Sequence, residues 1–300
     1  MANAVQAQSN PQAQSHAEAR GGSFKRVWFI TGAARGIGAL IAKAALADGN
    51  AVVAAGRNVE AIVRALGESP ALLPVRLDVT SEAEAHAAVQ AAVARFGRID
   101  VVINNAGFGL LGAVEESSDA DVRRMYDTNV FGLLNVTRAV LPVMRARRAG
   151  HVINISSLGG YRAAVGFGAY SSTKFAVEGL SEALHAELAP LGIHVTVVEP
   201  GYFRTDFLDS ASLTVAASVI DDYAGTAGRI REVAGTLNHQ QPGDPARLAQ
   251  AMVTLVDAEA PPLRLPLGTD ALRTIEEKNA YVARETQAWR ALASSTDFAA

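Results

Sequence analysis

Three residues in the middle of the chain have the types and the spacing of a proton-transfer device. Tyr170 follows Ser157 by 13 residues, and Lys174 follows Tyr170 by 4. If residues 170–174 are helical, the phenol and the ammonium lie on the same face of the helix. A free phenol titrates near pKa ~10, and a neighbouring cation favours the phenolate, so Lys174 is expected to lower the pKa of Tyr170 toward the neutral range. The pattern predicts acid–base chemistry at Tyr170.

A glycine-rich turn precedes these residues in the chain, from Thr31 to Gly38. It follows a β-branched stretch and precedes apolar residues at helical spacing, so it is expected to join the first strand to the first helix. There, Gly32 permits the tight turn, Gly36 lets the backbone approach a pyrophosphate, and Gly38 allows the helix to pack on the sheet. The helix N-terminus offers unpaired N–H groups to an anion. A dinucleotide site is therefore predicted, and a purely structural turn is the alternative.

Six motifs together resemble those of the short-chain dehydrogenase/reductase family. They occur in the family's order and with its spacings over about 170 residues. They are Thr31-Gly-x-x-x-Gly-x-Gly38, Asn104-Asn105-Ala106-Gly107, Asn129, Ser157, Tyr170-x-x-x-Lys174 and Pro200-Gly201. A chance match of all six in register is not credible.

The resemblance implies a role for each residue of the chemical site. Tyr170 would be the general acid or base, and Ser157 would hold the substrate oxygen. Ser156 competes with Ser157, but side chains alternate along a strand, so only one of them points inward, and the 13-residue spacing favours Ser157. Lys174 would bind the nicotinamide ribose and tune Tyr170, unless it is a surface residue that only supports the helix. Asn129 would hold a water that links Lys174 to solvent, or else be an ordinary buried amide.

The residues after the second and third predicted strands favour NADP(H) as the cofactor. NAD-preferring relatives carry an acid after the second strand, but residues 54–58 contain none. Arg57 and Arg35 instead supply guanidinium groups, which match the geometry of a 2′-phosphate. The alternative is that both are solvated surface charges. Asp78 would accept from the adenine amine and Val79 would pack on the ring, although Asp78 could be only a helix N-cap.

Further cofactor contacts are implied in the turns after three strands. Ala106 and Gly107 are small and leave room for the ribose and nicotinamide, although the alternative is a turn with no role beyond the backbone conformation of the loop. The remaining residues expected at the cofactor are Ile37, Asn105, Tyr170, Pro200, Gly201, Phe203 and Thr205. No metal is expected, because the chain has no cysteine and its six histidines show no ligand spacing.

Short β-branched runs alternate with longer amphipathic stretches, which indicates parallel strands joined by helices. The fold class expected is α/β, a doubly wound Rossmann fold with a seven-stranded, mostly parallel sheet in the order 3-2-1-4-5-6-7 and helices on both faces. Strands are predicted at 27–31, 51–55, 72–78, 101–104, 151–156, 194–199 and 263–267. Helices are predicted from 37, near 59–66, after a capping box at Ser81 and Glu84, and at 119–147, 169–188, 245–257 and 269–293.

Composition suggests how the chain is divided. Residues 1–23 are rich in Gln, Ala, Ser and Asn and lack the apolar stretch of a signal peptide, so they are expected to be a disordered tail. No linker interrupts the rest, and a hydrophobic content of 49% can supply one large core, so residues 24–300 are expected to form a single domain. Residues 202–243 lack clear periodicity and are expected to be a mobile lid over a substrate pocket.

The net charge and the hydropathy of the chain limit the kinds of partner that it is expected to bind. A formal net charge of −3 argues against a nucleic-acid partner. The chain has no run of about 18 apolar residues, so no membrane span is expected, and we expect a cytoplasmic protein. The family usually forms homodimers or homotetramers through the helices that correspond to residues 119–147 and 169–188.

The expected function is an NADP(H)-dependent oxidoreductase that interconverts a carbonyl and a secondary alcohol. Apolar residues after two turns suggest a lipophilic substrate: Leu110, Leu111, Phe203, Phe207, Leu208 and Leu213. For a short, charged keto acid instead, Arg162 or Arg204 would be the carboxylate partner. A catalytically silent NADPH-binding regulator is the main alternative, and its catalytic positions would be degenerate. An epimerase or dehydratase would carry Gly-x-x-Gly-x-x-Gly and a larger C-terminal domain, which this chain lacks.

Overall fold

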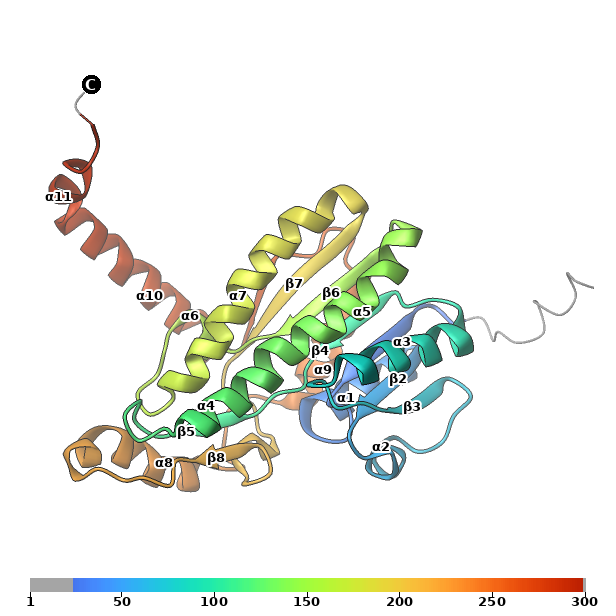
Figure 1. Ribbon diagram of the computed structural model, residues 1–300, viewed down its shortest axis with the longest axis horizontal. Coiled ribbons are helices and arrows are strands. Elements are labelled where there is room, and N and C mark those ends of the chain that lie inside the picture. The colour runs from blue at the N-terminus through green and yellow to red at the C-terminus, as the bar shows by residue number, and fades with distance from the viewer. Residues whose placement is uncertain (1–23, 299–300) are drawn as a thin grey trace, which may run out of the picture.

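A parallel sheet of seven strands forms the centre of the computed structural model, which describes residues 24–298 (Figure 1). The spatial order is β3-β2-β1-β4-β6-β7-β9, and each neighbouring pair is parallel. The strands are β1 (Val27–Thr31), β2 (Ala51–Gly56), β3 (Leu72–Arg76), β4 (Val101–Asn104), β6 (Gly150–Ile155), β7 (Ile193–Pro200) and β9 (Arg264–Leu267). Counted along the chain, they have the order 3-2-1-4-5-6-7, so the predicted topology is confirmed.

Helices cover both faces of this sheet. The main helices outside the 202–243 segment are α1 (Gly36–Ala47), α2 (Val59–Leu66), α3 (Glu82–Phe96), α4 (Asp119–Tyr126), α5 (Gly132–Arg147), α7 (Gly168–Leu188), α9 (Pro245–Asp257) and α10 (Thr269–Ala288). Helices α3 and α5 share one buried cluster with the sheet, and α1 and α9 share another. Strand β1 serves both, because Val27 and Phe29 point to the first cluster while Trp28 and Ile30 point to the second. A strand buried on both faces is apolar throughout, so the continuous apolar run in β1 predicts a strand inside the sheet.

Two of the predicted helices are interrupted. The stretch from 119 to 147 consists of α4, a wide π turn at Asp127–Phe131, and α5. The prediction of one helix over 269–293 was wrong, since α10 ends at Ala288 and α11 (Arg290–Ser294) begins after Trp289. Both segments around Trp289 are exposed, so no tertiary packing holds them in one continuous helix. Figure 1 shows α10 and α11 projecting away from the sheet.

The predicted capping box before α3 is half right. The Ser81 hydroxyl accepts a hydrogen bond from the Glu84 amide at 3.2 Å. The Glu84 carboxylate does not return to Ser81; it accepts from the Asp78 amide at 2.9 Å and pairs with Arg76 at 2.8 Å. The two oxygens of this carboxylate are taken by Arg76 and the Asp78 amide, and the bond to the charged guanidinium is stronger than one to a neutral amide.

The segment 202–243 contains regular structure that the sequence did not reveal. Strand β8 (Leu213–Val215) pairs in parallel with β5 (Gly109–Leu111), and α8 spans Arg229–Leu237. Both strands have three residues, too few for a recognisable alternation. The predicted N-terminal tail lies outside the described residues. Within the part of the chain that the structure describes, no helix combines the length and the apolarity needed to cross a membrane.

Candidate active site

The predicted site residues meet at the carboxyl ends of the central strands. The sheet order reverses between β1 and β4, and in doubly wound folds ligands bind at that point. The glycine turn follows β1, Asn105 follows β4, Ser157 follows β6, and the Pro200-Gly201 pair ends β7.

The glycine turn has the backbone that its sequence predicted. Gly32 and Gly36 have φ values of +67° and +55°, where side chains are disfavoured. A Cβ on Gly38 would lie 2.5 Å from both the Asn105 Nδ2 and the Gly32 carbonyl oxygen, so any larger residue would displace the turn. A Cβ on Gly36 would have no described heavy atom within 4 Å. The turn is therefore open at Gly36, where a pyrophosphate is expected.

Asn105 fastens the β4 loop to the glycine turn. Its backbone amide donates to the Thr31 hydroxyl at 2.9 Å, and its side-chain amide donates to the Thr31 carbonyl at 2.9 Å. The Ala106 amide donates to the same hydroxyl at 3.0 Å. Thr31 thus organises both turns, a role that its sequence position did not disclose.

Asn129 lies in the π turn between α4 and α5, and it is buried. Its Oδ1 accepts from the Phe108 amide at 3.0 Å. Its Nδ2 donates to the Phe108 carbonyl at 3.0 Å and to the Thr173 hydroxyl at 3.1 Å. The side chain thus ties the loop after β4 to α7 beside Lys174. These contacts match the alternative of a buried, hydrogen-bonded amide; the water-holding role is still a prediction.

Ser157, Tyr170 and Lys174 converge, as their spacing predicted. Tyr170 and Lys174 are both buried on α7, and the Lys174 Nζ lies 5.8 Å from the centroid of the Tyr170 ring. A Cβ on Gly159 would lie 3.5 Å from the Ser157 Oγ and 3.6 Å from the Tyr170 Cε1, so hydroxyl and ring border the same small space. The Lys174 Nζ donates to the Ile155 carbonyl at 2.9 Å.

The two neighbouring serines point in different directions. Ser157 caps the short helix α6 (Leu158–Tyr161), because its Oγ accepts from the Gly159 amide at 3.0 Å. The Ser156 Oγ instead lies with Glu178 around the position that a Cβ on Gly160 would occupy. Strand alternation therefore places Ser157, and not Ser156, beside Tyr170.

Burial has the largest effect on the pKa values of Tyr170 and Lys174. It raises the pKa of Tyr170 to about 12, although the Ser157 hydroxyl opposes this shift. Burial also lowers the pKa of Lys174 to about 8, opposed by the charge of Glu178. The expected lowering of the Tyr170 pKa is therefore wrong for the protein alone. The phenolate would lose its hydration, and the Lys174 ammonium is held by a carbonyl oxygen.

The two arginines predicted at the 2′-phosphate differ in their contacts. Arg57 follows β2 and is exposed, and Asn58 caps α2 by accepting from the Ala61 amide at 2.8 Å. The Arg35 guanidinium donates to the Ala211 carbonyl in the 202–243 segment. Among the described residues, the Arg57 side chain makes no hydrogen bond or ion pair with the rest of the protein, whereas Arg35 already bonds to a carbonyl oxygen.

Asp78 and Val79 are held by their neighbours. The Asp78 Oδ1 accepts from the Thr80 amide at 3.0 Å and from its hydroxyl at 2.8 Å. Burial raises the pKa of Asp78, but these bonds and the charge of Arg57 hold it below its ordinary value. Ser81 caps α3, so the N-cap alternative for Asp78 is wrong. The Val79 side chain packs on Gly132, where a Cβ would lie 2.5 Å from its Cγ2.

The turn after β7 depends on an acid that the sequence analysis missed. The Tyr202 amide donates to the Asp270 carboxylate at 2.7 Å, and a Cβ on Gly201 would collide with that carboxylate. An acidic residue in the first turn of a helix, as Asp270 is in α10, was the available signal. Thr205 accepts from the Phe207 amide at 3.3 Å. Phe203 turns inward and packs on the cluster that contains α9.

Aromatic side chains surround the Tyr170 ring. The centroid of Phe207 lies 5.7 Å and that of Phe167 lies 6.2 Å from the centroid of Tyr170. Leu110 is fully buried in the same cluster. Phe207 and Leu110 had been predicted near the site, whereas Phe167 had not.

Potential metal ligands meet in one place among the described residues. Ligand atoms of Asp206, Asp209 and His239 lie within 4.8 Å of one another, and Asp206 and His239 are exposed. The spacing of the histidines did not indicate this group, because the two acids lie 33 and 30 residues before His239 in the chain.

Comparisons with known proteins agree with this geometry. The family model described as short chain dehydrogenase matches residues 26–215. An oxidoreductase of Botryotinia fuckeliana is 37% identical over 269 residues, which are 89% of this chain and 97% of the relative. The 3-ketodihydrosphingosine reductase of Bacteroides thetaiotaomicron is 36% identical and covers 81% of this chain and 88% of its own length.

Solved structures show the same fold. The crystal structure of a short-chain dehydrogenase from Streptomyces avermitilis has a TM-score of 0.83 and 40% identity, and covers 91% of this chain and 100% of its own. A 3-ketoacyl-(acyl-carrier-protein) reductase from Brucella melitensis, complexed with NADH, has a TM-score of 0.69 and 28% identity, covering 81% and 97%. A serine dehydrogenase complexed with NADP+ has a TM-score of 0.68 and 29% identity, covering 80% and 94%. The match of the family model, the level of identity and the shared fold agree that the chain belongs to the short-chain dehydrogenase/reductase family of oxidoreductases.

Proposed function

We propose that the protein is an NADP(H)-dependent oxidoreductase that interconverts a carbonyl and a secondary alcohol. The observation that carries the proposal is the convergence of Ser157, Tyr170 and Lys174 beside an open glycine turn. A phenol and a hydroxyl that border one space can bind the same substrate oxygen.

The residues present fit a nicotinamide dinucleotide. Gly36 leaves space beside the N-terminus of α1 for a pyrophosphate, and a Cβ on Gly107 would lie 3.8 Å from the Lys174 Nζ, so a side chain there would crowd the ribose position. When bound, the cofactor supplies or accepts a hydride. Arg57 supports a preference for the 2′-phosphate form, whereas related structures contain either NADH or NADP+.

The chain's own groups handle the proton. Ser157 donates a hydrogen bond to the substrate oxygen and polarises the carbonyl. The raised pKa keeps Tyr170 protonated, so in carbonyl reduction it can donate its proton to that oxygen. Lys174 stabilises the phenolate that remains, because an adjacent cation favours the charged form. In alcohol oxidation the same groups act in reverse.

We further propose a lipophilic substrate. Phe167 and Phe207 flank the Tyr170 ring, and burial of apolar surface stabilises a complex by about 25 cal/mol per Å². The relative from Bacteroides thetaiotaomicron is named for a keto substrate, which is consistent with this class. The segment 202–243 would serve as the lid, and the protein would be a cytoplasmic homodimer or homotetramer.

A substrate panel tests the proposal. Purified protein is incubated with lipophilic ketones, secondary alcohols and short keto acids, and the absorbance of NADPH or NADH is followed. Turnover of a lipophilic ketone with NADPH is expected. NADPH binding without turnover of any compound would favour the regulator instead, and a preference for charged keto acids would point to Arg162 or Arg204.

A further inference from the structure

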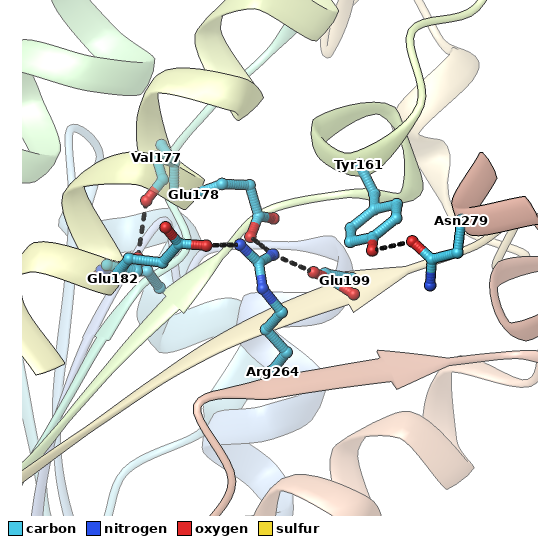
Figure 2. Close-up of polar contacts among 9 residues, drawn as sticks. Tyr161, Val177, Glu178, Glu182, Glu199, Arg264 and Asn279 are labelled. Carbon is cyan, nitrogen blue, oxygen red and sulfur yellow. Dashed lines mark hydrogen bonds and ion pairs between the residues drawn. The ribbon is translucent and has the colours of Figure 1, made fainter. Parts of the chain in front are cut away.

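A cluster of charged side chains lies next to Lys174. Arg264 of β9 is surrounded by three carboxylates, from Glu178 and Glu182 of α7 and Glu199 of β7 (Figure 2). Its Nη1 lies 2.7 Å from the Glu199 Oε1 and also contacts Glu178, while its Nη2 contacts Glu182. One guanidinium therefore faces three carboxylates, so the cluster carries excess negative charge if all of them are ionised.

Two of these carboxylates are deep in the protein. Glu178 is 5% exposed and Glu199 is fully buried, whereas the Glu182 side chain is 57% exposed. Among the described residues, the Glu178 Oε1 and the Glu199 Oε2 have no hydrogen-bond partner. A buried carboxylate oxygen without a partner is costly. The Ser156 hydroxyl lies near the Glu178 Oε1 and lowers the pKa of Glu178, so the environment of this oxygen favours its charged form.

The unpaired oxygen of Glu178 lies on the same face of α7 as Lys174. The two residues are four apart on α7, one helical turn. A Cβ on Gly160 would lie 3.0 Å from the Glu178 Oε1 and 3.1 Å from the Lys174 Cβ. One oxygen of Glu178 thus contacts Arg264, and the other lies toward the stem of Lys174 and the Ser156 hydroxyl.

We propose that Glu178 is a positioning residue that acts through Lys174: fixed by Arg264, it supplies the negative charge that keeps the buried ammonium ionised. The inference rests on the proposed function, in which a charged Lys174 supports Tyr170. It assigns a role to a residue and to a charged cluster that the proton transfer itself does not touch.

The ionisation of the two groups is consistent with this role. Burial lowers the pKa of Lys174, and the charge of Glu178 raises it. Burial raises the pKa of Glu178 to about 7, as does Glu199, while Ser156 and Arg264 lower it. The pKa values of the two groups therefore lie close together, and the charge of Lys174 depends on that of Glu178.

The other polar groups around Glu178 come from three neighbouring elements. They are Ser156 after β6, Glu199 of β7 and Arg264 of β9, with Glu182 on α7 itself. Tyr161 of α6 and Lys278 of α10 line a groove of ≈570 Å³ that also reaches Glu178 and Arg264. Tyr161 hydrogen-bonds to Asn279 at 2.5 Å, so α10 forms one wall of this groove (Figure 2).

The lysine content of the chain makes a direct test practical. It contains four lysines, Lys25, Lys43, Lys174 and Lys278, so the protein labelled with ¹³C at lysine Cε gives few signals. Lys174→Arg assigns the signal of Lys174. Its pKa is then measured by pH titration in the wild type and in Glu178→Gln, without cofactor or substrate. The substitution keeps the shape of the side chain and removes its charge.

The Lys174 pKa is expected to fall by about one pH unit in Glu178→Gln, because an opposite charge of a close neighbour has been removed. Glu182→Gln is the matched control: it also removes a carboxylate that contacts Arg264, but an exposed one, and should leave the Lys174 pKa within a few tenths of the wild-type value. Lys25 and Lys43 should not shift in either variant.

An unchanged Lys174 pKa in Glu178→Gln, or an equal fall in Glu182→Gln, would overturn the proposal. If Glu178→Gln does not fold, Glu178→Asp replaces it: the retracted carboxylate should lower the Lys174 pKa by a smaller amount, and no change would overturn the proposal. The titration needs no turnover. If the protein reduces ketones but the pKa of Lys174 is unchanged in Glu178→Gln, only the role of Glu178 is refuted. If that pKa falls but the protein turns over no substrate, only the proposed reaction is refuted.

Discussion

At the scale of single residues, one feature of the site keeps the Tyr170 phenol protonated and another stabilises the phenolate that forms when the proton is donated. Burial keeps the Tyr170 phenol protonated, with a pKa of about 12, which suits a group that must donate a proton to a carbonyl oxygen. The same burial opposes the phenolate that donation leaves behind. Lys174, with its Nζ 5.8 Å from the ring centroid, is the cation placed to stabilise it. Turnover should therefore depend on both groups, whereas of these two only Lys174 should affect cofactor binding strongly.

Tyr170→Phe is expected to lower kcat for ketone reduction by roughly 10²-fold or more, the scale of a lost general acid. NADPH affinity should persist, since the phenol is assigned to the substrate oxygen. Steady-state rates and a fluorescence titration with NADPH measure the two effects. Tyr126→Phe is the control, because it removes another phenol that bonds to α7, through Ser172 at 2.9 Å. Near-wild-type turnover by Tyr170→Phe would refute the assignment.

The rate of ketone reduction is expected to fall as the pH rises through about 8. Lys174 is charged below its pKa, which burial lowers to about 8, so its support for the phenolate is present at lower pH and lost in alkali. The measurement is kcat/KM for reduction between about pH 6 and about pH 10 at saturating NADPH. A profile that stays flat to the alkaline end would show that the charge of Lys174 does not limit the reaction.

Arg57→Ala should weaken NADPH binding by about 10 to 100-fold, since a hydrogen bond to a charged group contributes about 1.5 to 3 kcal/mol. NADH binding should hardly change, because NADH lacks the 2′-phosphate. Calorimetric titration with both cofactors measures the difference, and Arg64→Ala provides a control with an exposed arginine at the end of α2. Equal losses for NADPH and NADH would show that Arg57 is structural.

At the scale of elements, the segment 202–243 is fastened to the loop after β5 at several points. The buried Glu116 carboxylate pairs with Arg231 and accepts from the Ile220 amide at 3.0 Å and from the Ala113 amide at 2.7 Å. Arg231, with these two amides, lowers the pKa of Glu116 to about 2. The β5–β8 pair adds backbone hydrogen bonds. A lid built from this segment would be stable where Glu116 holds it, and would have to break these contacts to move as a whole.

Glu116→Gln is expected to accelerate hydrogen exchange of residues 213–231 by at least about tenfold, because it removes the charge that holds Arg231. Glu115→Gln serves as the control, since the one hydrogen bond of the Glu115 side chain among the described residues is accepted from the Tyr223 hydroxyl, at 2.6 Å. Because the pKa of Glu116 is depressed, its contribution is present above the ordinary glutamate pKa and is lost as the pH falls toward about 2. Unchanged exchange in Glu116→Gln would mean that β5 and β8 alone hold the segment.

At the scale of the whole molecule, local patterns predicted the sheet well and the long-range contacts poorly. Strands such as Val27–Thr31 are buried on both faces and therefore apolar throughout, and the glycine turn requires its backbone conformation. Strand β8 is too short to show a pattern. The pair between Arg264 and Glu178 joins residues 86 apart, so no local spacing announces it. The balance between burial and charge at Tyr170 likewise depends on neighbours that only the fold brings together.

We expect the protein to form a homodimer or homotetramer through residues 119–147, which contain α4, the π turn and α5, and through α7. Phe131 is 53% exposed in that turn and Phe175 is 45% exposed on α7, and burying such aromatic surface stabilises association. Light scattering should give twice or four times the mass of one chain. Phe131→Glu should raise the dissociation constant by about tenfold or more, because it places a charge in an apolar contact. Trp289→Glu, in the projecting α10–α11 segment and 65% exposed, provides the comparison: if only this variant dissociates, the C-terminal helices form the interface instead. A monomer at micromolar concentration would contradict the prediction altogether.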